Sequence, residues 1–386
     1  MSDYGIITGD HNLDMVERAF GERGLAPARI ELCLSKSGSP RRADGGCFYD
    51  ETSFIEAIVS SCDTRRPVCV LSNCIDDDAT VVESQLVELL SARAIPFVAH
   101  PHRTASIALD KWRTKELCHA LGIATPKGYV ANSAEEFRAD FFAGDDLVVC
   151  KRVNGSAGDD QKMIPARGSF AHLDFTAGPY LMEQFIRGHE VSVNVFATKD
   201  GLCPMPIMLK GPTRPDNVHA LDRVRIIPPQ YDGTLHTAVV TACRQLCSAL
   251  DPNGWLEFEF VVARNELYLF EINARYSGTT RAAHLATGVN PYRIALDYAL
   301  NGTMPSEFPA SHFVAELPMT EILTPAPDDD YIMYSSSRPR PGRLGRQIMV
   351  ASSLDELLAK IRRYAPVARR DEFQTSVLSY MRSPCL

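Results

Sequence analysis

Apolar and aromatic residues fill two neighbouring stretches of the chain, with few polar positions between them. The stretches are Trp255–Val262 and Leu267–Ile272, and this composition is typical of β-strands. Arg264 and Asn265 lie between the two stretches and supply the polar reversal of a tight turn. The pattern therefore predicts a two-stranded hairpin over residues 254–275.

Two carboxylates and an amide interrupt this apolar ribbon. A hairpin brings Glu259 and Glu271 side by side, and Asn273, two residues beyond Glu271, shares its face. Like charges this close repel strongly unless a cation compensates them, and oxygen ligands of this kind suit Mg²⁺. Arg275 follows on the same face, where its planar fork can hold a phosphate or carboxylate oxygen. For a lone E-x-N-x-R pattern, the alternative is a surface hairpin whose acids face solvent.

Short apolar runs alternate with helical patterns over the first hundred residues. We expect strands at Tyr4–Thr8, Ile30–Leu34, Pro67–Leu71 and Pro96–Ala99. Helices are expected at Asp14–Arg23 and Ala79–Arg93. Such alternation favours a parallel, doubly wound sheet. The chain has neither a G-x-G-x-x-G fingerprint nor a G-x-x-x-x-G-K-[ST] loop, so a simple Rossmann or P-loop nucleotide site is unsupported.

A glycine-rich turn between two predicted strands is a candidate phosphate site. It follows the strand pattern of Leu147–Lys151, and its small residues are Gly155, Ser156 and Gly158. Glycine lets the backbone close over a phosphate chain, while a strand lysine adds fixed positive charge. Lys111 opens a predicted helix, where its ammonium can also serve a phosphate. The alternatives are an ordinary glycine-rich hairpin and a solvated surface lysine.

A further connection between strands is a candidate site for a flat, edge-polar ring such as adenine. The strand pattern Tyr180–Glu183 leads into Gln184, Phe185 and Ile186, which offer backbone polar groups beside apolar side chains. Glu190 opens the next strand and can accept hydrogen bonds from ribose hydroxyls. Each glutamate can equally be a surface charge.

The remaining segments are predicted from periodicity. Strands are expected at 204–210, 313–322 and 347–351, and helices at 234–250, 291–300 and 354–364. The arginine-rich segment 335–346 is interpreted as a solvated loop.

Composition narrows the functional classes. The chain has 386 residues, 45% of them hydrophobic and 23% charged, which favours two or three globular domains. A net charge of −8 argues against broad nucleic-acid or membrane-surface binding. No apolar run reaches the roughly 20 residues of a membrane span, and no signal peptide is evident, so we expect a soluble cytoplasmic protein. The 11 cysteines form no C-x-x-C pair and are expected to be reduced.

The ordered set of these motifs resembles the ATP-grasp superfamily over roughly residues 100–302. The resemblance rests on Asp110-Lys111, Lys151 with G-S-A-G, the E-Q-F-I-x-G-x-E connection, and Glu259 with E-I-N-A-R. It implies an α/β ATP-grasp fold, in which two α+β lobes enclose ATP beside an N-terminal doubly wound parallel-sheet domain. The domains are expected at 1–100, at 101–185 for the small lobe, and at 186–386 for the large lobe with a C-terminal extension.

The resemblance also implies roles for particular residues. Lys111 and Lys151 would contact phosphates, Gly155 to Gly158 would cover them, Glu183 to Ile186 would hold adenine, and Glu190 the ribose. Glu259, Glu271 and Asn273 would bind two Mg²⁺ ions, or Mn²⁺, while Arg275 and Lys210 would act on the transferred phosphate. Arg223, Ser277, Gly278 and Arg281 are candidate substrate contacts. The family often has proline between the motif's asparagine and arginine, where this chain has Ala274.

The implied activity is an ADP-forming ligase that activates a carboxylate as an acyl phosphate and joins it to an amine, with amino-acid or peptide-like substrates. One alternative is a bicarbonate-activating enzyme similar to biotin carboxylase or carbamoyl phosphate synthetase, although no biotinyl or glutaminase module is evident. The other is a non-catalytic ATP-binding protein. The resemblance also makes a homodimer plausible.

Overall fold

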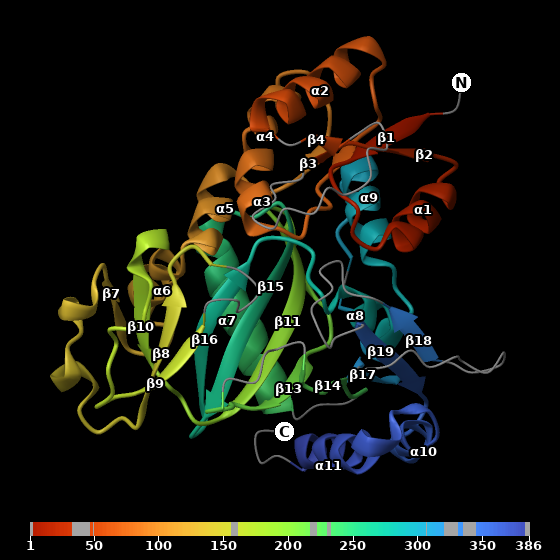
Figure 1. The fold of residues 1–386 in the computed structure, drawn as a ribbon. Coiled ribbons are helices and arrows are strands. Elements are labelled where there is room, and N and C mark those ends of the chain that lie inside the picture. Colours follow the sequence, from red (N-terminus) through yellow and green to blue (C-terminus); the bar gives the residue numbers. More distant parts are fainter. Residues whose placement is uncertain are drawn as a thin grey trace.

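Three main sheets organise the protein (Figure 1). The computed structural model describes residues 3–32, 47–48, 50–155, 161–216, 222–229, 233–305, 307–319, 331–334 and 345–382. A short parallel pair, β3 (Glu31–Leu32) and β4 (Cys47–Phe48), lies beside the first sheet.

The N-terminal sheet is parallel throughout, with the strand order β2-β1-β5-β6. Its strands are β1 (Tyr4–Ile7), β2 (Ala26–Arg29), β5 (Val70–Leu71) and β6 (Phe97–Val98). Alternate residues face opposite sides: Ile6 packs in the core with α2 (Glu51–Thr64) and α4 (Leu86–Ser91), and Ile7 packs with α1 (Leu13–Gly21). Helices therefore cover both faces, which confirms the predicted doubly wound sheet.

A helix from much later in the chain completes this N-terminal layer. α9 (Pro291–Asn301) packs against the same face as α1, and Tyr292 and Leu296 are fully buried there (Figure 1). Arg23 pairs with Asp297 at 2.5 Å across this contact. The N-terminal sheet and the C-terminal part of the chain therefore share one hydrophobic core.

The second sheet is antiparallel and has the order β7-β10-β8-β9. It consists of β7 (Gly128–Ala131), β8 (Leu147–Arg152), β9 (Lys162–Pro165) and β10 (Tyr180–Gln184). Aromatic residues form its core, where the rings of Phe137 and Phe170 stack with centroids 3.5 Å apart. α5 (His102–Leu109) and α6 (Lys111–Leu121) lead into it, and Asp110 caps α6 by accepting from two backbone N–H groups.

The third sheet has nine strands in the order β16-β15-β11-β13-β14-β17-β19-β18, with β12 paired to β11. Its bounds are β11 (His189–Thr198), β12 (Gly201–Pro204), β13 (Met208–Pro212), β14 (Arg225–Ile227), β15 (Gly254–Ala263), β16 (Glu266–Asn273), β17 (Phe313–Met319), β18 (Tyr331–Tyr334) and β19 (Gly345–Ala351). The helix α7 (Gly233–Leu250) covers one face, together with α10 (Leu354–Tyr364) and α11 (Arg370–Met381) (Figure 1). Strands after residue 305 thus continue the central sheet.

Three sequence expectations need correction. The strand that pairs with β1 in the N-terminal sheet is β2 (Ala26–Arg29) and not the expected Ile30–Leu34, within which Glu31–Leu32 forms β3 of the separate pair. The strand expected over 204–210 is divided into β12 and β13, because Pro204 and Pro206 lack the N–H groups that a continuous ladder requires. The helix expected over 79–93 is α3 (Asp77–Ser84) followed by α4, with a break at Gln85. Four helices were not predicted: α2, α5, α8 (Thr280–Thr287) and α11.

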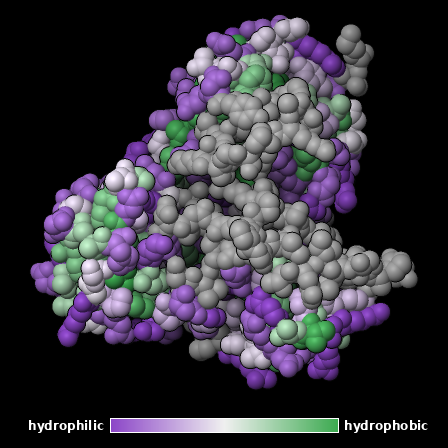
Figure 2. All heavy atoms as spheres, viewed as in Figure 1, coloured by the Kyte–Doolittle hydropathy of each residue, from purple (hydrophilic) through white to green (hydrophobic). Residues whose placement is uncertain are grey.

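The surface and the thiols add two observations. In the space-filling view, hydrophilic residues cover much of the described surface (Figure 2), and the exposed large apolar side chains among described residues are Leu89 and Val367. Eight cysteines are free and buried: Cys62, Cys69, Cys74, Cys118, Cys150, Cys203, Cys243 and Cys247. Within the described ranges, no helix is long and apolar enough to cross a membrane.

Candidate active site

The predicted hairpin is the β15–β16 ribbon, and it brings the two acids together. Glu259 lies directly opposite Glu271, and Glu257 lies opposite Asn273. Arg264 and Asn265 form the turn with φ values of 53° and 64°, the left-handed conformation that a two-residue hairpin loop favours. Glu259 and Glu271 lie side by side as predicted, and a β-bulge between Glu259 and Phe260 sets this register.

The face of the ribbon follows from strand alternation. Leu256, Phe258 and Phe260 pack in the core beneath α7, so the intervening Glu257 and Glu259 point to the opposite face. The N-terminal domain and the small antiparallel sheet lie on either side of the ribbon's end (Figure 1). The acids therefore face the region where the three sheets meet.

Two lysines hold the acids of the ribbon. Lys210 Nζ, from β13, lies 2.7 Å from Glu259 Oε2 and 3.3 Å from Glu257 Oε1. Lys111 Nζ lies 3.1 Å from Glu271 Oε1. Burial raises the pKa of Glu259 against the pull of Lys210, and the neighbouring carboxylates of Glu257 and Glu271 add to the rise. Burial also opposes ionisation of Glu271, but Lys111 and Lys151 outweigh it and lower its pKa.

The donor set fits a hard divalent cation. The side chains of Glu259 and Glu271 are 16% and 23% exposed, so both remain within reach of a ligand. Asn273 donates to Glu259 Oε1 at 3.3 Å and accepts from Arg275 at 3.0 Å. Within the described part of the chain, no group of three His, Cys, Asp or Glu residues is placed to hold a metal ion. A cation would therefore use the two acids and Asn273 together with oxygens of a bound ligand, as Mg²⁺ commonly does.

Glu183 stands at the centre of a buried ion triad with Lys115 and Lys151. Glu183 is 2% exposed, and its two carboxylate oxygens lie 2.7 Å from Lys115 Nζ and 2.7 Å from Lys151 Nζ. Burial opposes ionisation of Glu183, but the two lysines outweigh it and lower its pKa. Because this side chain is fully engaged, any contact of Glu183 with adenine would have to come from its backbone. The triad carries one net positive charge, which suits a phosphate beside Lys151.

The other predicted nucleotide residues lie nearby. Lys111 also donates to the backbone carbonyl of Gly155, so the glycine-rich segment begins directly beside the ribbon. Ser156 and Gly158 lie outside the described residues. Gln184 ends β10 and donates to Asp145 at 2.6 Å. Phe185 and Ile186 form the connection to β11, and the Phe185 N–H donates to the carbonyl of Leu147 at 3.3 Å.

The structure brings Glu190 and Arg223 together. Their side chains pair at 2.5 Å and are 15% and 10% exposed. The backbone carbonyl of Arg223 accepts from Arg346 at 2.8 Å, and Arg346 also pairs with Glu316 at 3.1 Å. The predicted ribose residue thus contacts a predicted substrate residue, and the C-terminal strands β17 and β19 support the pair.

The residues after the ribbon turn towards the N-terminal domain. Arg275 forms a two-pronged ion pair with Asp77 of α3, and Arg281 pairs with Asp14 at 2.5 Å. Ser277 is buried and its hydroxyl donates to Asn194 at 2.9 Å, whereas Gly278 is exposed. These contacts place Arg275 and Arg281 between the ribbon and the N-terminal part of the chain.

Three residues of this site were missed by the sequence analysis: Asp77, Lys115 and Glu257. Glu257 precedes Glu259 by two positions on a strand, and Lys115 follows Lys111 by one helical turn. Each residue was therefore expected on the same face as its predicted neighbour, and the spacing could have identified both. Asp77 had no such signal, because it pairs with Arg275 across 198 positions of the chain.

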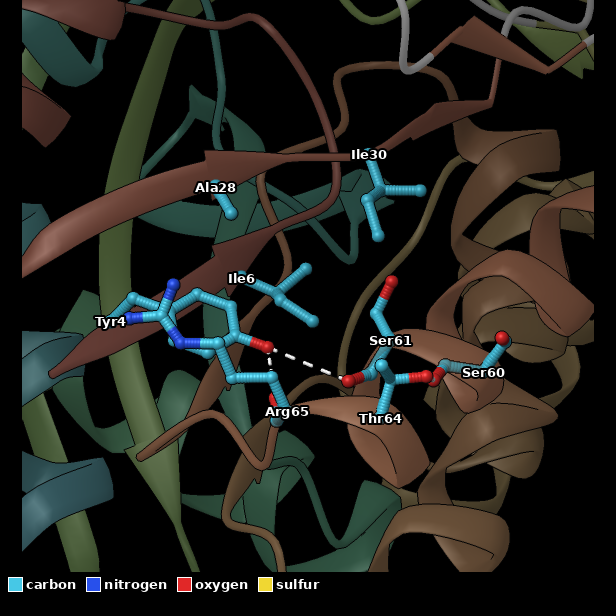
Figure 3. A pocket seen from close by; sticks show the side chains of 8 residues that line it. All are labelled: Tyr4, Ile6, Ala28, Ile30, Ser60, Ser61, Thr64 and Arg65. Carbon is cyan, nitrogen blue, oxygen red and sulfur yellow. Dashed lines mark hydrogen bonds between the residues drawn. The ribbon is translucent and has the colours of Figure 1, made fainter. Parts of the chain in front are cut away.

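A separate hollow of about 410 Å³ lies within the N-terminal domain (Figure 3). It is lined by Tyr4, Ile6, Ala28, Ile30, Ser60, Ser61, Thr64 and Arg65. None of these residues belongs to the ribbon or its partners.

Comparison with known proteins identifies the family. Residues 108–279 match the family model described as an ATP-grasp domain. The chain contains an ATP-grasp domain. The matched segment begins just before Lys111, ends just after Ser277, and so includes the two acids, the lysines and the glycine-rich segment.

The ATP-grasp protein is similar to several known proteins. A carbamoyl-phosphate synthase of Methanobrevibacter smithii is 27% identical over 218 residues, which cover 56% of this chain and 59% of that relative. A biotin carboxylase from Campylobacter jejuni has a TM-score of 0.72 at 16% identity and covers 100% of this chain and 96% of its own. An L-amino acid ligase from Bacillus licheniformis has a TM-score of 0.70 at 16% identity, covering 97% of this chain and 98% of its own. The structural likenesses confirm the ATP-grasp fold.

Proposed function

We propose that this protein is an ATP-dependent, ADP-forming ligase that activates a carboxylate and joins it to an amine. The proposal rests on one observation: Glu259 and Glu271 face each other on a buried ribbon beside Asn273, and lysines surround them. In such an arrangement the carboxylates can bind a metal ion, and the lysines can bind the phosphates of a nucleotide. The ATP-grasp domain and the fold likeness to an L-amino acid ligase support this interpretation.

The proposed roles are those that the ATP-grasp resemblance implies, and the contacts of the described residues support them. Lys111 and Lys151 bind phosphates, Gly155 to Gly158 cover them, Gln184 to Ile186 border the adenine, and Glu190 binds ribose. Glu259, Glu271 and Asn273 hold two Mg²⁺ ions, or Mn²⁺. When bound, Mg²⁺ would neutralise charge on the phosphate oxygens during transfer. Arg275 and Lys210 orient and stabilise the transferred phosphate.

The proposed reaction has two steps. A carboxylate oxygen of the acid attacks the γ-phosphorus, the bond from that phosphorus to ADP breaks, and an acyl phosphate forms. The amine nitrogen then attacks the carbonyl carbon, a carbon–nitrogen bond forms, and phosphate leaves while the amine proton passes to solvent. Closure by the glycine-rich segment would protect the acyl phosphate from water.

Amino-acid or peptide-like molecules are the proposed substrates. The L-amino acid ligase, which this chain resembles over 97% of its length, supports that class. Arg223, Ser277, Gly278 and Arg281 are proposed to contribute to the substrate pocket. We also propose that the protein is cytoplasmic and homodimeric, with no nucleic-acid or membrane partner.

A second candidate is activation of bicarbonate. The carbamoyl-phosphate synthase and biotin carboxylase likenesses favour it. The two candidates differ in the species whose addition triggers ADP formation, since a bicarbonate-activating enzyme needs no amino acid for that step. A non-catalytic nucleotide-binding protein would form no ADP with either addition.

The test measures phosphate release from Mg·ATP across single and paired amino acids, with bicarbonate as a separate condition, and identifies products by mass spectrometry. A condensed product that requires a particular acid and amine supports the ligase. Release with bicarbonate alone supports the second candidate. Nucleotide binding without release under any condition would favour the non-catalytic alternative.

A further inference from the structure

Arg275 is held by a residue of a different domain. Its Nε donates to Asp77 Oδ1 at 2.7 Å and its Nη2 donates to Asp77 Oδ2 at 3.0 Å. The two side chains are 12% and 10% exposed, so this pair is largely shielded from solvent. Asp77 lies in the first turn of α3, above the end of the ribbon (Figure 1).

The carboxylate partner of Arg275 lies outside the ribbon, whereas the partners of the two lysines of the site lie on it. Lys111 and Lys210 pair with the ribbon acids themselves, Glu271 in one case and Glu257 with Glu259 in the other. Arg275 stands two residues beyond Asn273 and contacts it at 3.0 Å, yet its remaining fork is turned to Asp77.

The charges around Arg275 compete for it. Asp77 holds the guanidinium from one side, while Asn273, which Arg275 also contacts, lies opposite Glu257 and donates to Glu259 on the ribbon. The carboxylates of the ribbon therefore attract Arg275 as well. If Asp77 lost its charge, the guanidinium would be drawn towards the acids of the ribbon.

We propose that Asp77 is a positioning residue that keeps Arg275 away from the ribbon acids and leaves Glu259 and Glu271 available to a divalent cation. The inference rests on the proposed function, because it concerns the same metal site. It makes the N-terminal domain part of that site, since the carboxylate that restrains Arg275 comes from α3. Mutation of a residue that orients the groups around a metal ion without binding the ion itself typically lowers metal affinity by roughly 10- to 100-fold.

The test measures Mn²⁺ binding in the presence of ADP, which lacks the phosphate proposed to contact Arg275, by the loss of the free-ion electron paramagnetic resonance signal. Asp77→Asn keeps the shape of the side chain but removes its charge, so the Kd for Mn²⁺ should rise by roughly 10- to 100-fold. The double variant Asp77→Asn/Arg275→Gln should bind Mn²⁺ within about threefold of the wild type, because the competing cation is gone. A purely structural role for Asp77 would not show this rescue.

Asp297→Asn is the matched control. Asp297 also joins the N-terminal layer to the later chain, by pairing with Arg23 at 2.5 Å, but it is remote from the ribbon. Its Mn²⁺ affinity should equal that of the wild type. If Asp77→Asn alone fails to fold, the double variant still decides the matter, because removing both partners of a buried pair is far less costly than removing one.

The outcomes separate the two proposals. Unchanged Mn²⁺ affinity in Asp77→Asn, or a double variant as weak as the single one, overturns the role of Asp77 and leaves the ligase proposal standing. Failure of the wild-type protein to bind Mn²⁺ with the nucleotide overturns the proposed metal site and this inference together.

Discussion

Lys115 and Lys151 share one carboxylate: each ammonium lies 2.7 Å from a different oxygen of Glu183. Lys115 comes from α6 and Lys151 from β8, so Glu183 on β10 joins the helix to the small sheet. Lys115 is 1% exposed and also donates to Thr125 at 3.0 Å. Through Glu183, a residue with no access to solvent sets the position of the lysine proposed to meet a phosphate.

Lys115→Met should therefore destabilise the protein. Loss of one partner leaves buried Glu183 with incomplete compensation, and breaking a buried ion pair from one side costs about 3–5 kcal/mol. Urea unfolding measures this free energy. Lys162→Met, at an exposed position of β9, is the control and should change it by less than about 0.5 kcal/mol. Equal effects of the two substitutions would refute the structural role of the triad.

Glu271→Gln should abolish turnover under the ligase proposal. The substitution removes one of the two opposed carboxylates and the partner of Lys111, so we expect kcat to fall by at least about 100-fold. Steady-state phosphate release checks this. Glu266→Gln makes the same change at an exposed position of the same strand and should be nearly neutral. Full activity in Glu271→Gln would show that Glu271 is not a metal ligand.

Lys210→Met should shift the acidic limb of the pH–rate profile to higher pH. Burial and neighbouring carboxylates already raise the pKa of Glu259, and Lys210 is the charge that opposes this rise. Without Lys210, Glu259 takes up a proton at higher pH and loses its capacity to bind a cation. Lys199→Met, in an exposed turn, is the control. A limb that stays in place would show that Lys210 does not govern the charge of Glu259.

Glu83 should make stability depend on pH. It is 1% exposed, and Ser72 donates to it at 2.5 Å. Burial raises its pKa to about 7 from the 4.5 that is usual for a glutamate side chain. Because the folded state holds this proton more tightly, its contribution is fully present below about pH 4.5 and is lost as the pH rises through about 7. The loss amounts to roughly 3 kcal/mol.

Urea unfolding at several pH values tests this dependence. The difference in unfolding free energy between wild type and Glu83→Gln should change across this window and level off above it. Glu88→Gln, at an exposed position of α4, should follow the wild type at every pH. Parallel curves for wild type and Glu83→Gln would contradict the raised pKa.

Local pattern determined much of this protein. The apolar stretches Trp255–Val262 and Leu267–Ile272 and the polar pair Arg264-Asn265 were enough to predict the hairpin. Strand composition and turn geometry act over a few residues, and the parallel N-terminal sheet was predicted from the local alternation of strands and helices. A β-bulge beside Glu259, which the spacing did not predict, brings Glu259 opposite Glu271 instead of Phe270.

Tertiary structure decided the partners of those residues. Sequence spacing does not say that α6 packs where Lys115 reaches Glu183, that α9 covers the N-terminal sheet, or that Asp77 meets Arg275. Each of these contacts depends on how separate helices and sheets bury their apolar faces against one another, which is set by the packing of the whole core. The sequence by itself determined which charged groups the ribbon carries, and only the folded protein decided which opposite charge holds each of them.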